Sequence, residues 1–205
     1  MKILFQGDSI TDCGRDKRNY HDLGPGYPKY AAELIREGYP EVDFEFINFG
    51  IGGNRTSQLF DRLYLDGIVF QPDVISIFIG INDIWHRHDF EKIATTDEQT
   101  KLNYRSILER IKRETNAKII MIEPYLLDAP SIDYLRPDFE VLRKIVKELA
   151  DEYADAFIPL HEYFAEAMKT QPAPLYYSQD GVHPNVEGAK IIARYYKAAI
   201  DKIMK

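Results

Sequence analysis

The segment KILFQGDSIT, residues 2–11, starts with a short apolar run and then changes to polar residues. Its apolar part, residues 3–5, is continuous rather than alternating, which is typical of a strand buried on both faces of a parallel sheet. The polar triplet Gly-Asp-Ser follows at residues 7–9. We therefore predict a buried strand that places Ser9 at the carboxyl end of a sheet.

Four more short apolar segments follow along the chain. Those at residues 74–79 and 119–122 are strong continuous runs, the one at 44–49 is weaker and partly alternating, and the one at 156–158 is a short fifth candidate. Amphipathic patterns, with apolar residues three and four positions apart, separate or follow these runs. They predict helices at residues 28–36, 55–70, 98–114, 138–153 and 185–203. Alternating strands and helices predict a parallel sheet with helices on both faces.

The composition is that of one globular domain, which we expect to span residues 1–205. The 205 residues are 45% hydrophobic and 29% charged, which excludes global disorder and leaves too little chain for two comfortable cores. The net charge of −7, without a basic stripe, argues against a nucleic-acid partner. A single cysteine excludes an internal disulfide and a cysteine-rich zinc site, and we expect neither a metal nor a cofactor.

The N-terminal residues do not have the pattern of a secretory signal. Residues 1–5 hold only three apolar residues after Lys2, whereas a signal needs an apolar run of about 7–15 residues. No stretch approaches the roughly 20 apolar residues of a membrane span. We therefore expect a cytoplasmic protein with no membrane partner.

Two segments lack a helical or strand pattern and predict exposed loops. They are the polar, poorly periodic residues 85–100 and the shorter segment 129–137. In parallel α/β sheets, ligands bind beyond the carboxyl ends of the strands. We therefore expect the functional residues in loops that follow strands.

Ser9 occupies such a position directly after the first predicted strand. It can act as a nucleophile there, or it can simply cap the next helix. The surrounding sequence is not the Gly-x-Ser-x-Gly nucleophile elbow, because Thr11 stands at the second position after Ser9. Ser9 alone therefore leaves both interpretations open.

A second candidate is the pentapeptide DGVHP at residues 180–184. Its spacing lets Asp180 hold the Nδ1–H of His183, which leaves Nε2 free to take a proton from a serine. Pro184 suits the first position of the last helix and would place His183 at the N-cap. The positive helix end would then favour a neutral imidazole, with Asp180 opposing it. The alternative is a solvated turn in which Asp180 is only a cap.

Two further strand-end loops offer hydrogen-bond donors for an oxyanion. Residues 50–54, GIGGN, follow the second strand, and residues 80–83, GIND, follow the third. A missing oxyanion donor costs roughly 2.7–4 kcal/mol of barrier, so an acyl-transfer site needs such groups. Each loop alone is an ordinary strand-end loop. Together with Ser9 and DGVHP, all four features fall after predicted strands or at the start of the last helix, which favours a catalytic site.

These four features resemble the motif blocks of the SGNH hydrolase superfamily, the GDSL esterases. The matching residues are Gly7-Asp8-Ser9, Gly53, Asn82 and the stretch 180–183, in the family's order and across nearly the whole chain. The resemblance implies a three-layer, flavodoxin-like α/β/α sandwich of about five parallel strands. Residues 7–15, 24–27, 51–54, 79–85 and 182–188 are also similar to bacterial intracellular acetylxylan esterases.

The resemblance also implies a role for each matching residue. Ser9 is the nucleophile, His183 the general base and Asp180 the carboxylate that orients it. The oxyanion hole consists of the Ser9 and Gly53 N–H groups and the Asn82 side chain. Gly52 is the weaker candidate because the family's glycine directly precedes the polar residue that Asn54 matches.

The predicted loops are polar and aromatic rather than apolar, which suits a sugar better than a long acyl chain. We therefore favour hydrolysis of a short, acetyl-type ester on a carbohydrate such as a xylo-oligosaccharide. Asp8, Tyr27 and Trp85 are candidate substrate contacts, although Tyr27 and Trp85 suit core packing as well and Asp8 suits bracing of a loop. Two other readings stay open: a thioesterase or lysophospholipase of the same superfamily, and a non-catalytic binding or assembly subunit. A homo-oligomer also stays open, because acetylxylan esterases that resemble this chain form oligomers.

Overall fold

A computed structural model of the chain describes residues 1–89 and 94–205, with the backbone alone for residue 89. Its five strands form one sheet in the order β2-β1-β3-β4-β5, with every neighbouring pair parallel. The strands are β1 (Lys2–Gly7), β2 (Glu45–Asn48), β3 (Val74–Phe78), β4 (Lys118–Ile122) and β5 (Ala156–Ile158). The predicted parallel sheet and its five strands are confirmed.

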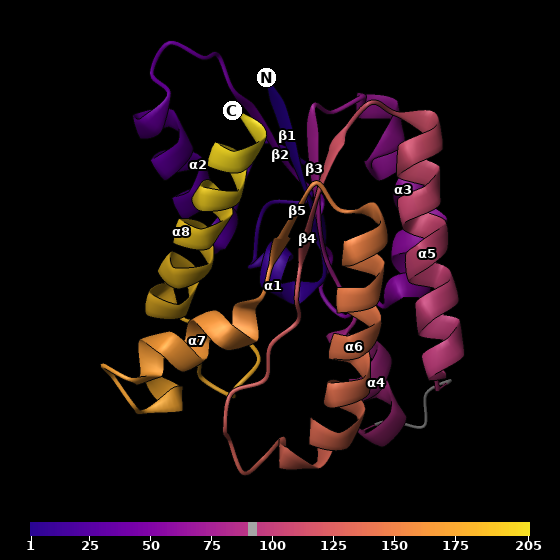
Figure 1. The fold of residues 1–205 in the computed structure, drawn as a ribbon, viewed down its shortest axis with the longest axis vertical. Coiled ribbons are helices and arrows are strands. Elements are labelled where there is room, and N and C mark those ends of the chain that lie inside the picture. The colour runs from indigo at the N-terminus through magenta and orange to yellow at the C-terminus, as the bar shows by residue number, and fades with distance from the viewer. Residues whose placement is uncertain (90–93) are drawn as a thin grey trace.

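Helices cover both faces of this sheet, as Figure 1 shows. Helices α2 (Tyr27–Gly38) and α8 (Val186–Ile203) lie side by side on one face. The other face carries α3 (Thr56–Asp66), α5 (Asp97–Glu114) and α6 (Arg136–Tyr153). The remaining helices are α1 (Ser9–Asp12), α4 (Ile81–Asp89) and α7 (Leu160–Met168), and short 3-10 turns are η1 (Ile68–Phe70), η2 (Asp133–Leu135) and η3 (Pro174–Tyr176). The predicted three-layer α/β/α sandwich is confirmed.

The strand order decides where a ligand can bind. The chain moves from β1 outward to β2, and then returns to place β3 on the other side of β1. In flavodoxin-like sheets, ligands usually bind at such a reversal, beyond the carboxyl ends of the strands on either side of it. Ser9 follows β1 and Asn82 follows β3, so both residues stand at the reversal.

The first of the two predicted loops is largely wrong, and the second is largely confirmed. Helix α4 runs through residues 85–89, because Ile81 and Ile84 give that segment a buried face, and α5 begins at residue 97. Thr96 caps α5 by accepting the Gln99 N–H, while the Gln99 side chain accepts the Thr96 N–H. The middle of the predicted loop, residues 90–93, lies outside the described residues. In the second segment, residues 129–135 form a loop and the short turn η2, and most of residues 129–137 are exposed. Only Ala129, Ile132 and Leu135 are buried there, and α6 begins at residue 136.

Three helices were not predicted at all, namely α1, α4 and α7, and all three are short. Helix α1 has four residues, too few for an apolar period to emerge. Helix α7 buries only Leu160 and Phe164, a single pair four positions apart. Among the predicted helices, the span 55–70 divides at Gly67 into α3 and the turn η1.

Tyr27 belongs to the core. It is 0% exposed, its ring packs against Phe5 and Phe78, and its hydroxyl is hydrogen-bonded to that of Thr11 at 3.2 Å. The expectation that Tyr27 contacts substrate is therefore wrong, and its alternative, core packing, is what the structure has. None of the helices in the described parts of the chain is long and apolar enough to cross a membrane.

Candidate active site

Ser9, His183 and Asp180 lie together although 174 positions separate the first two residues. The Ser9 Oγ lies 2.9 Å from the His183 Nε2, and the His183 Nδ1 lies 2.6 Å from the Asp180 Oδ2. An ionised carboxylate only accepts hydrogen bonds, so Nδ1 donates to Asp180 and Nε2 is left to accept from the Ser9 hydroxyl. This is the geometry in which an imidazole can take the serine proton.

The loop that carries Asp180 and His183 is tightly braced. The Asp180 Oδ1 accepts the backbone N–H groups of Val182 at 2.9 Å and His183 at 2.7 Å. The Ser178 hydroxyl donates to the His183 carbonyl at 2.7 Å and accepts the Gly181 N–H at 2.9 Å. Sequence reasoning missed Ser178, because a lone serine in a loop belongs to no motif or periodic pattern. Its bonds hold the two catalytic candidates in one rigid turn.

Gly181 is required at the centre of this turn. Its φ is +89°, and a Cβ there would lie 2.9 Å from the Leu127 carbonyl oxygen. Only glycine adopts such a backbone without strain. The turn that spaces Asp180 from His183 therefore depends on the residue between them.

The prediction that Pro184 is the first residue of the last helix is wrong by two residues. Helix α8 begins at Val186, and its N-cap is Asn185, whose side chain accepts the N–H groups of Glu187 and Gly188. Asparagine is among the best N-cap residues, and here it takes the position expected for His183. Pro184 lies before the helix and pairs with Ser178 in an isolated bridge. His183 is therefore not a helix cap.

The charges of the pair follow from these contacts. The hydrogen bond with Asp180 raises the pKa of His183 above its ordinary value of 6.5, although partial burial acts in the opposite direction. Partial burial acts to raise the pKa of Asp180, but the hydrogen bonds from the His183 ring and the turn's N–H groups together hold it well below its ordinary range. Asp180 therefore stays ionised and stabilises the protonated form of His183.

The structure also separates the two glycines proposed as oxyanion donors. The Gly52 N–H donates to the Asp12 carboxylate at 2.8 Å, so it is already in use. The Gly53 N–H lies on an exposed residue with a φ of +78°. Neither it nor the Ser9 N–H has an acceptor within residues 1–89 and 94–205. Both N–H groups are therefore free to donate to a ligand.

Asn82 connects the two donor loops. It lies in the first turn of α4, is 8% exposed, and donates from Nδ2 to the Asn54 carbonyl at 3.1 Å. An amide nitrogen has two hydrogens, so one remains for a second acceptor. The next residue, Asp83, is fully buried and accepts the Thr56 N–H at 2.9 Å and the Thr56 hydroxyl at 2.7 Å. Asp83 thus braces the start of α4 against the start of α3.

The Asp8 side chain is buried and braces the start of α1. Its Oδ1 accepts the Ile10 N–H at 3.1 Å and so caps α1. Burial raises the pKa of Asp8 to about 7, and the hydrogen bond from Ile10 and the nearby His183 offset only part of this effect. With 1% of its surface exposed, Asp8 presents no face to a substrate, so the expected substrate contact is not what the structure shows.

Trp85 is the remaining candidate substrate contact. It is half-buried on α4, and its ring centroid lies 6.1 Å from that of His183. The side chain therefore borders the catalytic candidates and also packs against the core. Its contact with substrate stays a prediction.

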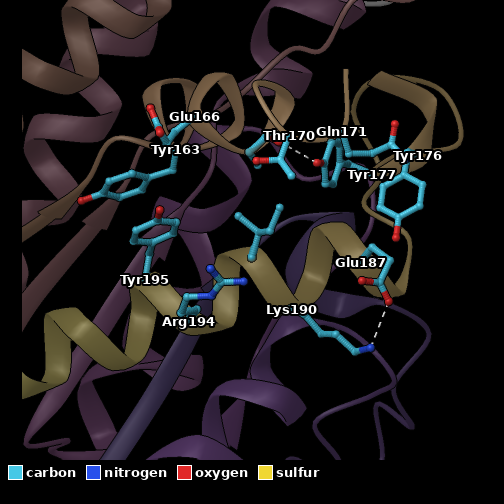
Figure 2. A pocket seen from close by; sticks show the side chains of 12 residues that line it. Tyr163, Glu166, Thr170, Gln171, Tyr176, Tyr177, Glu187, Lys190, Arg194 and Tyr195 are labelled. Carbon is cyan, nitrogen blue, oxygen red and sulfur yellow. Dashed lines mark hydrogen bonds and ion pairs between the residues drawn. The ribbon is translucent and has the colours of Figure 1, made fainter. Parts of the chain in front are cut away.

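A separate groove of about 480 Å³ lies between α7, the turn η3 and α8 (Figure 2). Two stacked tyrosine rings, Tyr163 and Tyr195, lie 3.4 Å apart at one side of it. Tyr177 is mostly buried there and donates from its hydroxyl to the Ala167 carbonyl at 3.0 Å, whereas Tyr176 is exposed. The residues that line this groove do not include Ser9, Asp180 or His183.

Comparison with known proteins agrees with this geometry. The family model described as "GDSL-like Lipase/Acylhydrolase family" matches residues 5–191. The chain belongs to this family. Among curated proteins, the GDSL-family chain is 36% identical to an acetylxylan esterase of Geobacillus stearothermophilus, over 95% of the chain and 91% of that protein. It is 26% identical to an acetylxylan esterase of Xylanibacter ruminicola, of which it covers 43%.

Solved structures of the family have the same fold. The acetylxylan esterase of G. stearothermophilus superposes with a TM-score of 0.88 at 33% identity, over 97% of this chain and 93% of that one. A GDSL-like lipase from Parabacteroides merdae superposes with a TM-score of 0.88 at 36% identity, over 98% of this chain and 95% of that one. Variants of the G. stearothermophilus enzyme described as catalytic mutants replace a serine, an aspartate and a histidine.

Proposed function

We propose that this GDSL-family protein is a serine esterase that removes acetyl groups from carbohydrates such as acetylated xylo-oligosaccharides. The observation that carries the proposal is the hydrogen-bonded series Ser9–His183–Asp180 at the edge of the sheet where free N–H donors gather. The similarity to two acetylxylan esterases supports the substrate class.

In the first half of the proposed reaction, the His183 Nε2 takes the proton of the Ser9 hydroxyl. The Ser9 Oγ then bonds to the carbonyl carbon of the acetyl ester, and the carbonyl electrons move onto its oxygen. The N–H groups of Ser9 and Gly53 and the amide of Asn82 donate to this oxyanion. As the carbonyl re-forms, the bond to the sugar oxygen breaks, and His183 gives its proton to that oxygen.

The second half releases the acid. Water enters the position that the sugar has left, and His183 takes a proton from it as it attacks the acetyl-serine. The same donors stabilise the second oxyanion, and the Ser9 Oγ regains its proton when acetate leaves. Asp180 stays ionised throughout and holds the histidine ring in orientation. The complete reaction consumes one ester and one water and needs no cofactor.

Several features favour a short acyl group on a polar alcohol. Trp85, beside His183, has an aromatic face and a polar N–H, a combination that suits a sugar ring. Both curated relatives are named for acetylxylan. We also propose that the enzyme acts in the cytoplasm on oligosaccharides small enough to be imported, and leave a homo-oligomer as a proposal to be tested by light scattering.

The deciding experiment measures acetate released from a panel of acetylated xylo-oligosaccharides and other acetyl-sugars. Wild-type protein is expected to release acetate, and Ser9→Ala is expected to release none above background. The p-nitrophenyl esters of acetate and octanoate test chain length, with acetate preferred. No release across the panel together with activity on a thioester would contradict the carbohydrate assignment, as would a preference for octanoate.

A further inference from the structure

Arg62 is a nearly buried cation on α3 whose contacts lie outside its own helix. Its side chain is 14% exposed. A buried charge is costly unless it is paired or hydrogen-bonded, so the position of its donors is informative. Four of its five hydrogen bonds leave α3, and the longest one, 3.3 Å to Asp66, is the ordinary pair between neighbouring helical turns.

The four other bonds gather the strand ends that surround the site. The Nη2 donates to the Gly7 carbonyl at 3.0 Å, and Nη1 donates to the Phe49 carbonyl at 2.8 Å. Nη1 also donates to the Gln6 side chain at 2.8 Å, and Nε donates to the Asn54 Oδ1 at 2.8 Å. Arg62 therefore joins the end of β1, the segment after β2 and the loop that contains Gly53.

Two of the four acceptors stand close in the chain to a group of the proposed oxyanion hole. Gly7 lies two residues before Ser9, and Asn54 directly follows Gly53. The Asn54 carbonyl in turn accepts the Asn82 amide at 3.1 Å. Through these contacts, one side chain is connected to all three sources of oxyanion donors.

The chemistry of arginine suits this position. A guanidinium is planar and presents five N–H donors in a rigid fork, so several acceptors can be held at set distances at once. A lysine has the same charge but a single nitrogen on a flexible stem. A lysine at this position could not reach the four acceptors that lie on three different segments.

We propose that Arg62 is a positioning residue that holds the Gly53 N–H and the Asn82 amide in register with the Ser9 Oγ. It does not touch substrate and acts through Gly7 and Asn54. This inference rests on the proposed function, because it concerns the donors of the same reaction.

The test compares Arg62→Lys and Arg62→Ala with wild type on p-nitrophenyl acetate. We expect kcat to fall at least about tenfold, toward the roughly 100-fold that a misplacement of about 1 Å can cost. KM should stay within about twofold, since the lost interaction acts only in the transition state. Added guanidinium ion should restore part of the activity of Arg62→Ala, whereas ethylammonium should not. The acid limb of the pH profile should not move, because Asp180 and His183 are not among the contacts of Arg62.

A matched control is Arg110→Ala on α5. Arg110 is 24% exposed and makes two hydrogen bonds, both to Glu114 on its own helix and neither to a strand end. Its variant should keep wild-type kcat. Asn54→Ala provides a second test that removes only one acceptor of Arg62, and it should lower kcat in the same direction with an effect that does not add to that of Arg62→Lys.

Different results would contradict the proposed function and the role of Arg62. If the wild-type protein shows no hydrolysis that depends on Ser9, the proposed function itself is contradicted. If the wild type is active and both Arg62→Lys and Asn54→Ala, measured below their melting temperatures, keep its kcat, only the role of Arg62 is overturned. A rise in KM at constant kcat also overturns it, because Arg62 would then serve substrate binding. If Arg62→Ala does not fold, the lysine and Asn54 variants decide the matter.

Discussion

Replacing Asn82 with alanine removes one of the three proposed oxyanion donors and little else. The side chain is 8% exposed and makes one hydrogen bond, from Nδ2 to the Asn54 carbonyl at 3.1 Å. Asn54 is itself half-buried, so water can replace the lost donor. The net loss of folding stability should be about 0.5–1.5 kcal/mol, the value of an ordinary hydrogen bond.

The catalytic loss should be much larger. An oxyanion donor is worth roughly 2.7–4 kcal/mol in the transition state. At about 1.36 kcal/mol for each factor of ten, this corresponds to a fall in kcat of about 100-fold to 900-fold. The ground-state ester carbonyl carries little charge, so KM should change by no more than about twofold.

The assay is steady-state hydrolysis of p-nitrophenyl acetate by wild type, Asn82→Ala and a control, Asn103→Ala. Asn103 is half-buried, and its Nδ2 donates to the Thr56 hydroxyl at 3.3 Å. It therefore matches Asn82 in residue type and in donating a side-chain hydrogen bond from Nδ2, but it holds no position in the proposed oxyanion hole. The control should keep wild-type kcat.

Two results would refute this reasoning. If Asn82→Ala keeps more than about a tenth of wild-type kcat, its amide does not serve the transition state. If Asn103→Ala loses as much activity as Asn82→Ala, the effect arises from loosening around the start of α3 and not from a missing donor.

Three further predictions concern the serine, the pH profile and the turn. Ser9→Ala should abolish both ester hydrolysis and labelling by a fluorophosphonate probe read by mass spectrometry; labelling elsewhere with intact activity would contradict the assignment. His183 must be neutral to accept a proton and its pKa is raised by Asp180, so kcat/KM should fall as the pH drops through a value above 6.5. Asp180→Asn should move that acid limb to lower pH and reduce kcat, by roughly 10⁴-fold in the comparable protease triad; an unmoved limb counts against the pair. Gly181→Ala should lower the free energy of unfolding in urea by about 1–3 kcal/mol, because alanine is strained at a φ of +89° and its Cβ meets the Leu127 carbonyl; unchanged stability would show that the turn tolerates a side chain.

The sequence was informative wherever the signal is local. Short apolar segments predicted all five strands, and the continuous ones among them did so because parallel strands are buried on both faces. The three-residue spacing of Asp180 and His183 predicted their contact, since a turn of that length fits a carboxylate against an imidazole. The motif resemblance favoured Gly53 over Gly52 as the oxyanion donor. The structure provides a physical reason, because the Gly52 N–H is already bonded to Asp12.

Local signals failed where a residue's role depends on what packs against it. The sequence left Tyr27 open between substrate contact and core packing, and the structure packs it against rings of β1 and β3. Pro184 suited a helix start, yet the Asn185 side chain could cap α8 and so set its first residue. Residues 85–89 looked like a loop because their apolar partners, Ile81 and Ile84, lie in the preceding motif.

The sequence by itself determined the parallel α/β class, the strand positions and the residue types of the candidate site, since each depends on neighbours within a few positions. Tertiary structure alone decided that the Ser9 Oγ lies 2.9 Å from the His183 Nε2. It also decided that Arg62 joins the strand ends around them. Such contacts depend on the strand order and on how α3 and α8 pack against the sheet, and no local pattern encodes the distance between segments so far apart in the chain.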